Sequence, residues 1–347
     1  MTSEAPPFWW ASADWRAWAL WPFSAIYGLV GARRMARAKR EPVAAPVLCV
    51  GNLTVGGTGK TPTVIALCRA AVARGLRPGV LSRGHGGSMH HPHVVDLQVD
   101  GARQVGDEPL LLARHAPVAV TPDRAAGARL LIEEGCDFLI MDDGFQSARI
   151  RYDYALIVID ARRGIGNAHV IPGGPMRAPL IQQMRFADAV LAIGEGDGAD
   201  RVIRATARAG KPVYSAVMRP ENADEIAGGT FLAFAGIGDP EKFFDSARRA
   251  GAQLEGMRAF GDHHLYSQDD IGELADAAKR AGADLLTTEK DAVRLASGSA
   301  GLRAFAETVA VLKIAVAFER DDAPDAIISA TLAAFEKRRF GVSRPGS

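Results

Sequence analysis

Residues 47–62, which read VLCVGNLTVGGTGKTP, constrain the fold of this 347-residue chain more than any other stretch. A short apolar run precedes a glycine-rich turn, and a helical pattern begins near the GKT triplet. A strand, a glycine-rich loop and a helix in this order are typical of a phosphate-binding loop, because glycines let backbone N–H groups face phosphate oxygens. We therefore predict that a nucleotide binds at Thr54, Val55, Gly56, Gly57, Thr58, Gly59, Lys60 and Thr61.

Two side chains of this loop have expected roles. Lys60 would reach the β- and γ-phosphates, and Thr61 would give its hydroxyl to Mg²⁺. The loop departs from the pattern G-x-x-x-x-G-K-[ST] at Thr54, which stands where the first glycine is usual, and it has extra glycines at positions 56 and 57. The alternative is a glycine-rich turn that binds nothing, and the well-placed GKT disfavours it.

The pattern after Val47 predicts an α/β protein with a mostly parallel, P-loop-type sheet flanked by helices, because short apolar runs alternate with helical periodicity. A polar, glycine-containing segment at 218–229 suggests a domain boundary. The expected parts are an N-terminal interface helix with a basic segment (1–42), a P-loop core domain (43–225) and a smaller α/β domain that closes over the nucleotide (226–340). We expect strands at 47–51, 78–82, 118–121, 137–143, 154–160, 188–194, 212–217 and 230–238, helices at 61–74 and 123–134, and apolar runs within 284–295 and 308–318.

Charge and cysteine content exclude some classes of function. The chain has 41 Lys+Arg against 40 Asp+Glu, so we expect no nucleic-acid partner, and no feature indicates an obligate protein partner. The three cysteines, Cys49, Cys68 and Cys136, are odd in number and lack metal-ligand spacing. This pattern predicts reduced core thiols in a cytosolic compartment.

The N-terminal segment differs from a soluble domain. An apolar run over 17–32, interrupted by Pro22, is followed by a basic cluster at 33–40. The run is shorter than the roughly 20 apolar residues that span a bilayer. We interpret it as a helix in the membrane interface, with Trp15, Trp18 and Trp21 at headgroup depth and the basic cluster on anionic lipid. A core-packed helix with a solvated basic end is the alternative.

Acidic side chains follow two predicted elements. Asp142 and Asp143 come directly after an apolar run, at the strand end where open α/β sheets bind ligands, and such a pair suits Mg²⁺. Asp107 and Glu108 precede a proline-started helix, where capping alone would explain their charge. The first pair carries more weight because of the phosphate-binding loop.

Histidines occur in two loops. The segment FGDHHLY places Asp262, His263 and His264 together, an arrangement suited to deprotonating a hydroxyl, although metal binding or capping also fits. In 84–93 a flexible loop is favoured over a metal site, because no fixed spacing holds together His85, His90, His91 and His93.

Seven motifs in order resemble one family, the tetraacyldisaccharide 4'-kinases of lipid A biosynthesis. They are VGNLTVGGTGKTP, LSRGHGG, VGDEPLLLA, MDDGFQ, DARRGIGN…IPGGPMRAP, FGDHH and TTEKDAVRL, and they run from residue 50 to residue 295. Each motif alone is modest, and the ordered set is highly specific. The resemblance implies ATP-dependent phosphorylation, with Mg²⁺, of the 4'-hydroxyl of a lipid disaccharide 1-phosphate. It also implies a peripheral or monotopic enzyme at the cytoplasmic face of the inner membrane.

The resemblance also implies roles for individual residues. Asp107, paired with His263 from the other domain, would accept the proton of the acceptor hydroxyl, and Asp262 would orient that histidine. Lys60 and Thr61 would hold the phosphates and the metal. The metal set would be completed by Asp142, Asp143 and Gln146, and substrate contacts are expected at Glu108, Asn167 and Arg177.

The chain departs from the family pattern at three positions. Ser147 stands where histidine is usual, Ala178 where a carboxylate is usual and His85 where tyrosine is usual. The phosphate and base groups are intact. The alternative function is a P-loop nucleotide-switch ATPase or GTPase recruited to the membrane, and such a switch would not need the DHH segment. A third hypothesis, a membrane-recruited scaffold with a vestigial nucleotide site, is disfavoured because Lys60 and Thr61 are intact.

Overall fold

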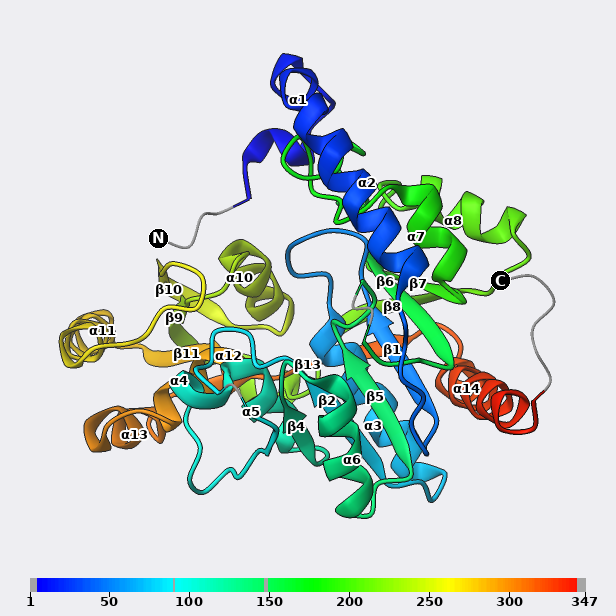
Figure 1. Ribbon diagram of the computed structural model, residues 1–347. Helices are drawn as coiled ribbons and strands as arrows, with labels where there is room; N and C mark the ends of the chain where they lie inside the picture. The colour runs from blue at the N-terminus through cyan, green and yellow to red at the C-terminus, as the bar shows by residue number, and fades with distance from the viewer. Residues whose placement is uncertain (1–4, 90, 147–148, 342–347) are drawn as a thin grey trace.

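The computed structural model describes residues 5–89, 91–146 and 149–341. They form two α/β units, each built around its own sheet (Figure 1). The larger sheet has nine strands in the order β13-β8-β7-β6-β1-β5-β2-β4-β3, and its seven central strands are parallel. Its strands are β1 (Val47–Gly51), β2 (Pro78–Ser82), β3 (His93–Val94), β4 (Val118–Val120), β5 (Phe138–Asp142), β6 (Tyr154–Asp160), β7 (Ala189–Ile193), β8 (Val213–Pro220) and β13 (Ile314–Phe318).

The central strands are apolar throughout because both faces of the sheet are covered. Along β1, Leu48 and Val50 point into the core on one face, and Val47 and Cys49 point into the core on the other. All three cysteines are buried and free, in agreement with their predicted place in the core. The helices of this unit are α3 (Lys60–Ala73), α4 (Ala102–Val105), α5 (Asp107–Ala113), α6 (Arg124–Glu133), α7 (Leu180–Phe186), α8 (Asp200–Arg208) and α14 (Ala323–Arg339).

The smaller unit has a four-stranded parallel sheet in the order β10-β9-β11-β12. Its two faces carry separate apolar cores. The strands are β9 (Thr230–Ala235), β10 (Gln253–Ala259), β11 (Asp284–Thr288) and β12 (Ala310–Leu312), and the helices are α9 (Ala223–Ile226), α10 (Pro240–Arg249), α11 (Gln268–Ala281), α12 (Glu289–Ala296) and α13 (Ala300–Ala306).

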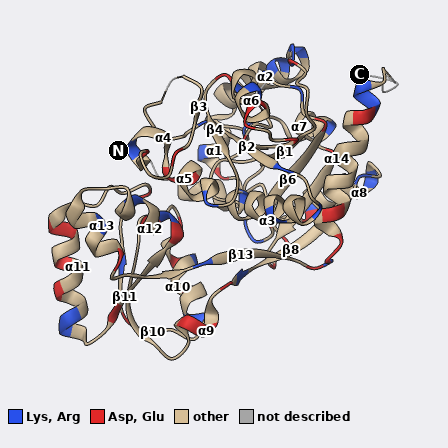
Figure 2. Ribbon diagram, turned by 90° about the horizontal axis from the view of Figure 1, so that it is seen from below, with Lys and Arg blue, Asp and Glu red and all other residues tan. Residues whose placement is uncertain are grey.

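One predicted boundary is wrong. The second domain was expected to extend to residue 340, but β13 pairs antiparallel with β8 at the edge of the large sheet. Ile327 and Ile328 of α14 lie in the core of the first unit. The chain therefore enters the second unit after β8 and returns after β12, and Figure 2 shows β8 and β13 running between the two units. Antiparallel pairing with β8 gives β13 its hydrogen bonds and places α14 on the large sheet.

The N-terminal segment is partly docked and partly exposed. It contains a 3-10 turn (Pro7–Trp10), α1 (Trp15–Ala19) and α2 (Trp21–Arg37), which project from the body in Figure 1. One side of α2 contacts the segment 167–179: the Ser24 hydroxyl accepts a hydrogen bond from the Gly173 N–H (3.0 Å). Large apolar side chains are exposed on both helices: Trp15 and Trp18 on α1, and Trp21, Phe23, Ile26, Tyr27, Leu29 and Val30 on α2. Among the described residues, no helix combines the length and the apolar character needed to cross a bilayer.

Candidate active site

The phosphate-binding loop runs from the end of β1 to the start of α3. Gly59 precedes the helix with a φ of 87°, a left-handed conformation that favours glycine. A Cβ at this position would lie 2.6 Å from Met218 Cε and 2.9 Å from Ile193 Cδ1, so conformation and space both require glycine here. The loop is therefore built on the expected strand, turn and helix.

Thr54 fits the loop because this loop starts as an extended segment. Thr54 forms an antiparallel bridge with Met176, and Val55 N–H donates to the Pro175 carbonyl (3.0 Å). The φ of Thr54 is not positive, since the described non-glycine residues with positive φ are Asp143, Ala168 and His263. Pairing with the segment 167–179 thus takes the place of the glycine turn that the usual pattern has.

Asp142 and Asp143 follow one another at the end of β5 but lie in different surroundings. Asp143, whose φ is 48°, accepts hydrogen bonds from both terminal nitrogens of Arg177 (2.7 and 3.0 Å) and lies 3.8 Å from Lys60 Nζ. Burial raises the pKa of Asp143, but Lys60 and Arg177 outweigh burial and hold that pKa below its usual value. Asp143 therefore links the phosphate-binding loop to Arg177.

Asp142 is buried, and burial together with the nearby Glu108 raises its pKa to about 7. Among the described residues, its Oδ1 atom and the Thr58 hydroxyl are buried without a hydrogen-bond partner. A buried carboxylate oxygen without a partner fits a divalent cation, and Thr61 lies in the first turn of α3 with its side chain buried. These groups fit Mg²⁺, which when bound would neutralise phosphate charge.

Gln146 and Asn167 support loops in this structure. The Gln146 amide donates to the Asn52 carbonyl (2.6 Å), and its oxygen accepts from Arg177 (3.4 Å). The Asn167 amide donates to the Gly173 carbonyl (2.8 Å), which holds the turn within 167–179. The metal role of Gln146 and the substrate role of Asn167 stay predictions. Of the departures from the family pattern, Ala178 is buried in the core, and Ser147 lies outside the described residues.

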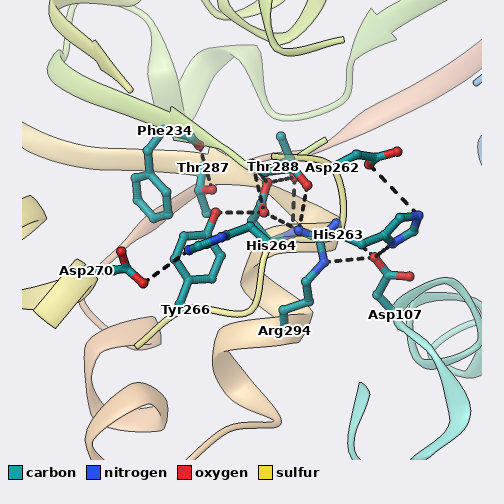
Figure 3. A network of polar contacts seen from close by, with 12 residues as sticks. Asp107, Phe234, Asp262, His263, His264, Tyr266, Asp270, Thr287, Thr288 and Arg294 are labelled. Atoms are coloured by element: carbon teal, nitrogen blue, oxygen red, sulfur yellow. Dashed lines mark hydrogen bonds and ion pairs between the residues drawn. The ribbon is translucent and has the colours of Figure 1, made fainter. Parts of the chain in front are cut away.

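Asp107 and His263 meet across the two units, as predicted. Asp107 begins α5, and His263 lies in the loop after β10 with a φ of 57°. The Nδ1 atom of His263 lies 3.2 Å from Asp107 Oδ2, which raises the pKa of the imidazole (Figure 3). Asp262 Oδ1 lies 3.9 Å from the other ring nitrogen, beyond hydrogen-bond distance. Asp107 thus holds the ring at Nδ1, the orienting position that was predicted for Asp262.

Two cations of α12 complete this cluster, and both lie within the motif TTEKDAVRL without a predicted role. Arg294 Nε donates to Asp107 Oδ2 (2.8 Å), and Lys290 forms an ion pair with Glu108. Lys290 lowers the pKa of Glu108, and His263 and Arg294 outweigh burial to lower that of Asp107, so both acidic residues of GDEP are ionised. The four-residue spacing of the two cations places them on one face of α12, which is a readable signal, but their partners depend on how the units pack.

Two observations concern the histidine-rich segment. The centroids of the His85 and His263 rings are 6.2 Å apart. His85, which stands where the family usually has tyrosine, therefore lies beside the imidazole of the His263–Asp107 pair. His93 begins β3, and its Nε2 lies 2.6 Å from Asp100 Oδ2, so this end of the segment is a strand and not the expected flexible loop. His90 lies outside the described residues. Among the described residues, no three His, Cys, Asp or Glu side chains gather as a metal site.

A second set of ion pairs joins the units on the other side of the phosphate-binding loop. Lys242 of α10 donates to Asp160 at the end of β6 (2.9 Å), and Arg163 donates to Asp239 (2.7 Å). The Arg163 guanidinium also lies over the Trp10 ring, 5.4 Å from the ring centroid. The molecule is thus a P-loop nucleotide-binding enzyme whose phosphate loop lies on one unit and whose imidazole–carboxylate pair is assembled from both units.

The family follows from comparison with known proteins. A family model described as tetraacyldisaccharide-1-P 4'-kinase matches residues 16–333, and the chain belongs to that family. A protein from Mesorhizobium japonicum named tetraacyldisaccharide 4'-kinase is 58% identical over 341 residues, 98% of this chain and 99% of that protein. One of the same name from Chelativorans sp. is 56% identical over 336 residues, 97% of this chain and 98% of that protein.

A solved structure shows the same fold. The crystal structure of LpxK from Aquifex aeolicus in complex with ATP aligns with a TM-score of 0.71 and 26% sequence identity. The alignment covers 91% of this chain and 99% of that chain. The similarity therefore extends over both units.

Proposed function

We propose that this protein transfers the γ-phosphoryl group of ATP to the 4'-hydroxyl of a tetraacyldisaccharide 1-phosphate in lipid A biosynthesis. The observation that carries the proposal is the contact between Asp107 on the P-loop unit and His263 on the smaller unit. A nucleotide switch has no need for an imidazole–carboxylate pair of this kind, whereas transfer to a sugar hydroxyl needs a group that accepts its proton.

The donor half of the site lies on the large sheet. Lys60 and the backbone of residues 54–61 would bind the phosphates, and Thr61 with Asp142 would hold Mg²⁺. Arg177 keeps Asp143 beside Lys60, so this carboxylate orients the lysine. Transfer of a phosphoryl group depends mainly on positioning and on neutralising charge, and these groups supply both.

The acceptor half is assembled from both units. Asp107 holds His263 through Nδ1, which leaves Nε2 to take the proton of the 4'-hydroxyl. Because His263 and its partner lie on different units, the base is complete only when the units are together. This arrangement would limit hydrolysis of ATP in the absence of the lipid.

We further infer that the protein is peripheral and works at the cytoplasmic face of the inner membrane. The support is the exposed apolar surface of α1 and α2, followed by the basic cluster at 33–40. Large exposed apolar surfaces mark interaction sites, and aromatic side chains beside arginines suit a layer of anionic headgroups. The core-packed alternative does not account for this exposure.

One experiment tests the reaction. Purified protein is incubated with γ-labelled ATP, Mg²⁺ and tetraacyldisaccharide 1-phosphate in detergent micelles, and lipid and free phosphate are separated. We expect the label in the lipid fraction. Mass spectrometry of the product should locate the new phosphate at the 4' position. Label that appears only as free phosphate, at a rate independent of the lipid, would support the switch and overturn the proposal.

A further inference from the structure

The Asp107 carboxylate has a second partner that the proposed reaction does not yet use. Arg294 donates through Nε to the same Oδ2 atom that His263 contacts, at 2.8 Å against 3.2 Å for the imidazole (Figure 3). Two nitrogens so close to one oxygen are at most about 6 Å apart, a separation at which charges interact strongly in a buried site. The arginine therefore acts on the same carboxylate as the base.

Arg294 is held rigidly on the smaller unit. Its side chain is only 2% exposed, and Nη1 donates to Asp291 Oδ1 (2.6 Å) and to the Gly236 carbonyl (2.8 Å). Asp291 is itself buried and accepts from the Tyr266 hydroxyl (2.8 Å). A guanidinium held by this many charge-assisted hydrogen bonds cannot turn away from the site without breaking a buried ion pair.

The same backbone carbonyl also fixes His263. The His263 backbone N–H donates to the Gly236 carbonyl (3.0 Å), which also accepts from Arg294 Nη1 (2.8 Å). One oxygen of the smaller unit thus anchors the His263 backbone and the Arg294 guanidinium, and one oxygen of the P-loop unit receives both side chains. The imidazole and the guanidinium are presented to Asp107 as a fixed pair.

We propose that Arg294 is a positioning residue of the transfer reaction: by sharing Asp107 Oδ2 with His263, it limits how strongly Asp107 holds the imidazole proton. An unshared carboxylate at this distance would stabilise the imidazolium and make the ring a poor base at neutral pH. The arginine also opposes the charged imidazole directly. Both effects keep His263 free to accept a proton.

Other charged and titratable groups also lie near His263. Asp262 lies on the same loop as His263, and His85 faces His263 from the loop after β2. The ion pair of Glu108 and Lys290 lies beside Asp107. Among the described residues, only His263 and Arg294 hydrogen-bond to the Asp107 Oδ2 atom. Variants at Arg294 leave all of them in place.

The test measures the pH dependence of kcat/KM for the whole chain with the disaccharide lipid. This inference rests on the proposed function, in which His263 must be neutral to accept a proton. In Arg294→Gln we expect the acidic limb to move to higher pH by about one unit, since a cation about 6 Å from the ring is lost. Arg294→Lys should return the limb toward its wild-type position, although with a lower kcat. Arg248→Gln, which removes an exposed arginine of the same unit, should leave the limb unchanged.

A second measurement does not depend on activity. The pKa of His263 is followed by NMR of protein with ¹⁵N-labelled histidine, with His263→Gln to assign the signal. Asp291→Asn/Arg294→Gln removes both charges of the buried pair and so avoids an isolated buried aspartate if the single variant fails to fold. We expect a raised imidazole pKa in either variant. An unchanged or lowered pKa in the variants would overturn the inference. If the variants show the raised pKa but the wild-type protein labels no lipid, only the proposed function is overturned.

Discussion

Two neighbouring aspartates at the end of β5 should respond in opposite ways to loss of their charge. Asp142 is buried with one oxygen unpartnered among the described residues, and its pKa is raised to about 7. Asp143 is held by Arg177 and Lys60, and its pKa is lowered. We predict that Asp142→Asn stabilises the metal-free protein at pH 8 and abolishes transfer, whereas Asp143→Asn destabilises the protein.

The magnitude follows from the pKa of Asp142. An unfolded aspartate titrates near 3.9, so between about pH 4 and pH 7 the folded state keeps a proton that the unfolded state has lost. Stability therefore falls as pH rises through this window and is constant above it. A difference of about three pH units corresponds to about 4 kcal/mol as an upper bound, and we expect Asp142→Asn to recover about half of it.

The assay is thermal unfolding followed by circular dichroism, after removal of metal and nucleotide, at pH 4.5 and pH 8. We expect a higher Tm for Asp142→Asn at pH 8 and little difference from wild type at pH 4.5. Added Mg²⁺ and ATP should raise the Tm of wild type more than that of Asp142→Asn, because binding occurs to the folded state. A Tm at pH 8 equal to or below that of wild type would refute the reasoning that Asp142 is an uncompensated buried carboxylate.

Four further predictions concern the phosphate loop, the base, the N-terminal segment and the metal site. Lys60→Ala should abolish lipid labelling while circular dichroism shows an intact fold, and normal turnover would remove Lys60 from the site. His263→Ala should lower kcat by roughly 10²- to 10⁴-fold with little change in ATP affinity, as for loss of a general base, and an unchanged rate would move attention to His264. Deleting residues 1–40 should reduce co-sedimentation with anionic liposomes, while full co-sedimentation of the truncated protein would contradict the interfacial role of α1 and α2. Apparent Mg²⁺ affinity, measured by titration of ATP hydrolysis or Tm, should fall as pH drops below about 7, because a proton competes for Asp142.

The sequence was sufficient for the P-loop sheet because its signals are local. Strands buried on both faces are continuous apolar runs, and β1, β5 and β6 lie within one residue of their predicted bounds. The expected helix at 123–134 corresponds to α6, whose N-cap is Asp123. Periodicity and capping residues are read directly along the chain, so these elements were predictable.

The return of the chain to the first unit was not predictable in this way. Residues 308–318 read as one apolar run, but Lys313 divides it between β12 in one sheet and β13 in the other. No glycine or proline marks the change of sheet. The choice is made by the free edge of β8, which is a property of the folded sheet.

The site shows the same division. Each acidic and imidazole group was visible as a motif, and the contact between Asp107 and His263 was expected only because the family resemblance implied it. The partners of Lys290 and Arg294 had no such guide, because an ion pair between residues 182 or 187 positions apart depends on the packing of two units. Local patterns name the functional groups, and tertiary packing decides which of them meet.

The entry and exit of the smaller unit lie side by side. Glu221 N–H donates to the Lys313 carbonyl (2.8 Å), and Lys313 N–H donates to the Asn222 side chain (2.9 Å). A segment whose two ends are adjacent can be gained or lost by a gene through a single insertion, because the host fold needs only a short turn between β8 and β13. An ancestral P-loop protein could thus have acquired an acceptor-handling module in one genetic event, with its original sheet intact.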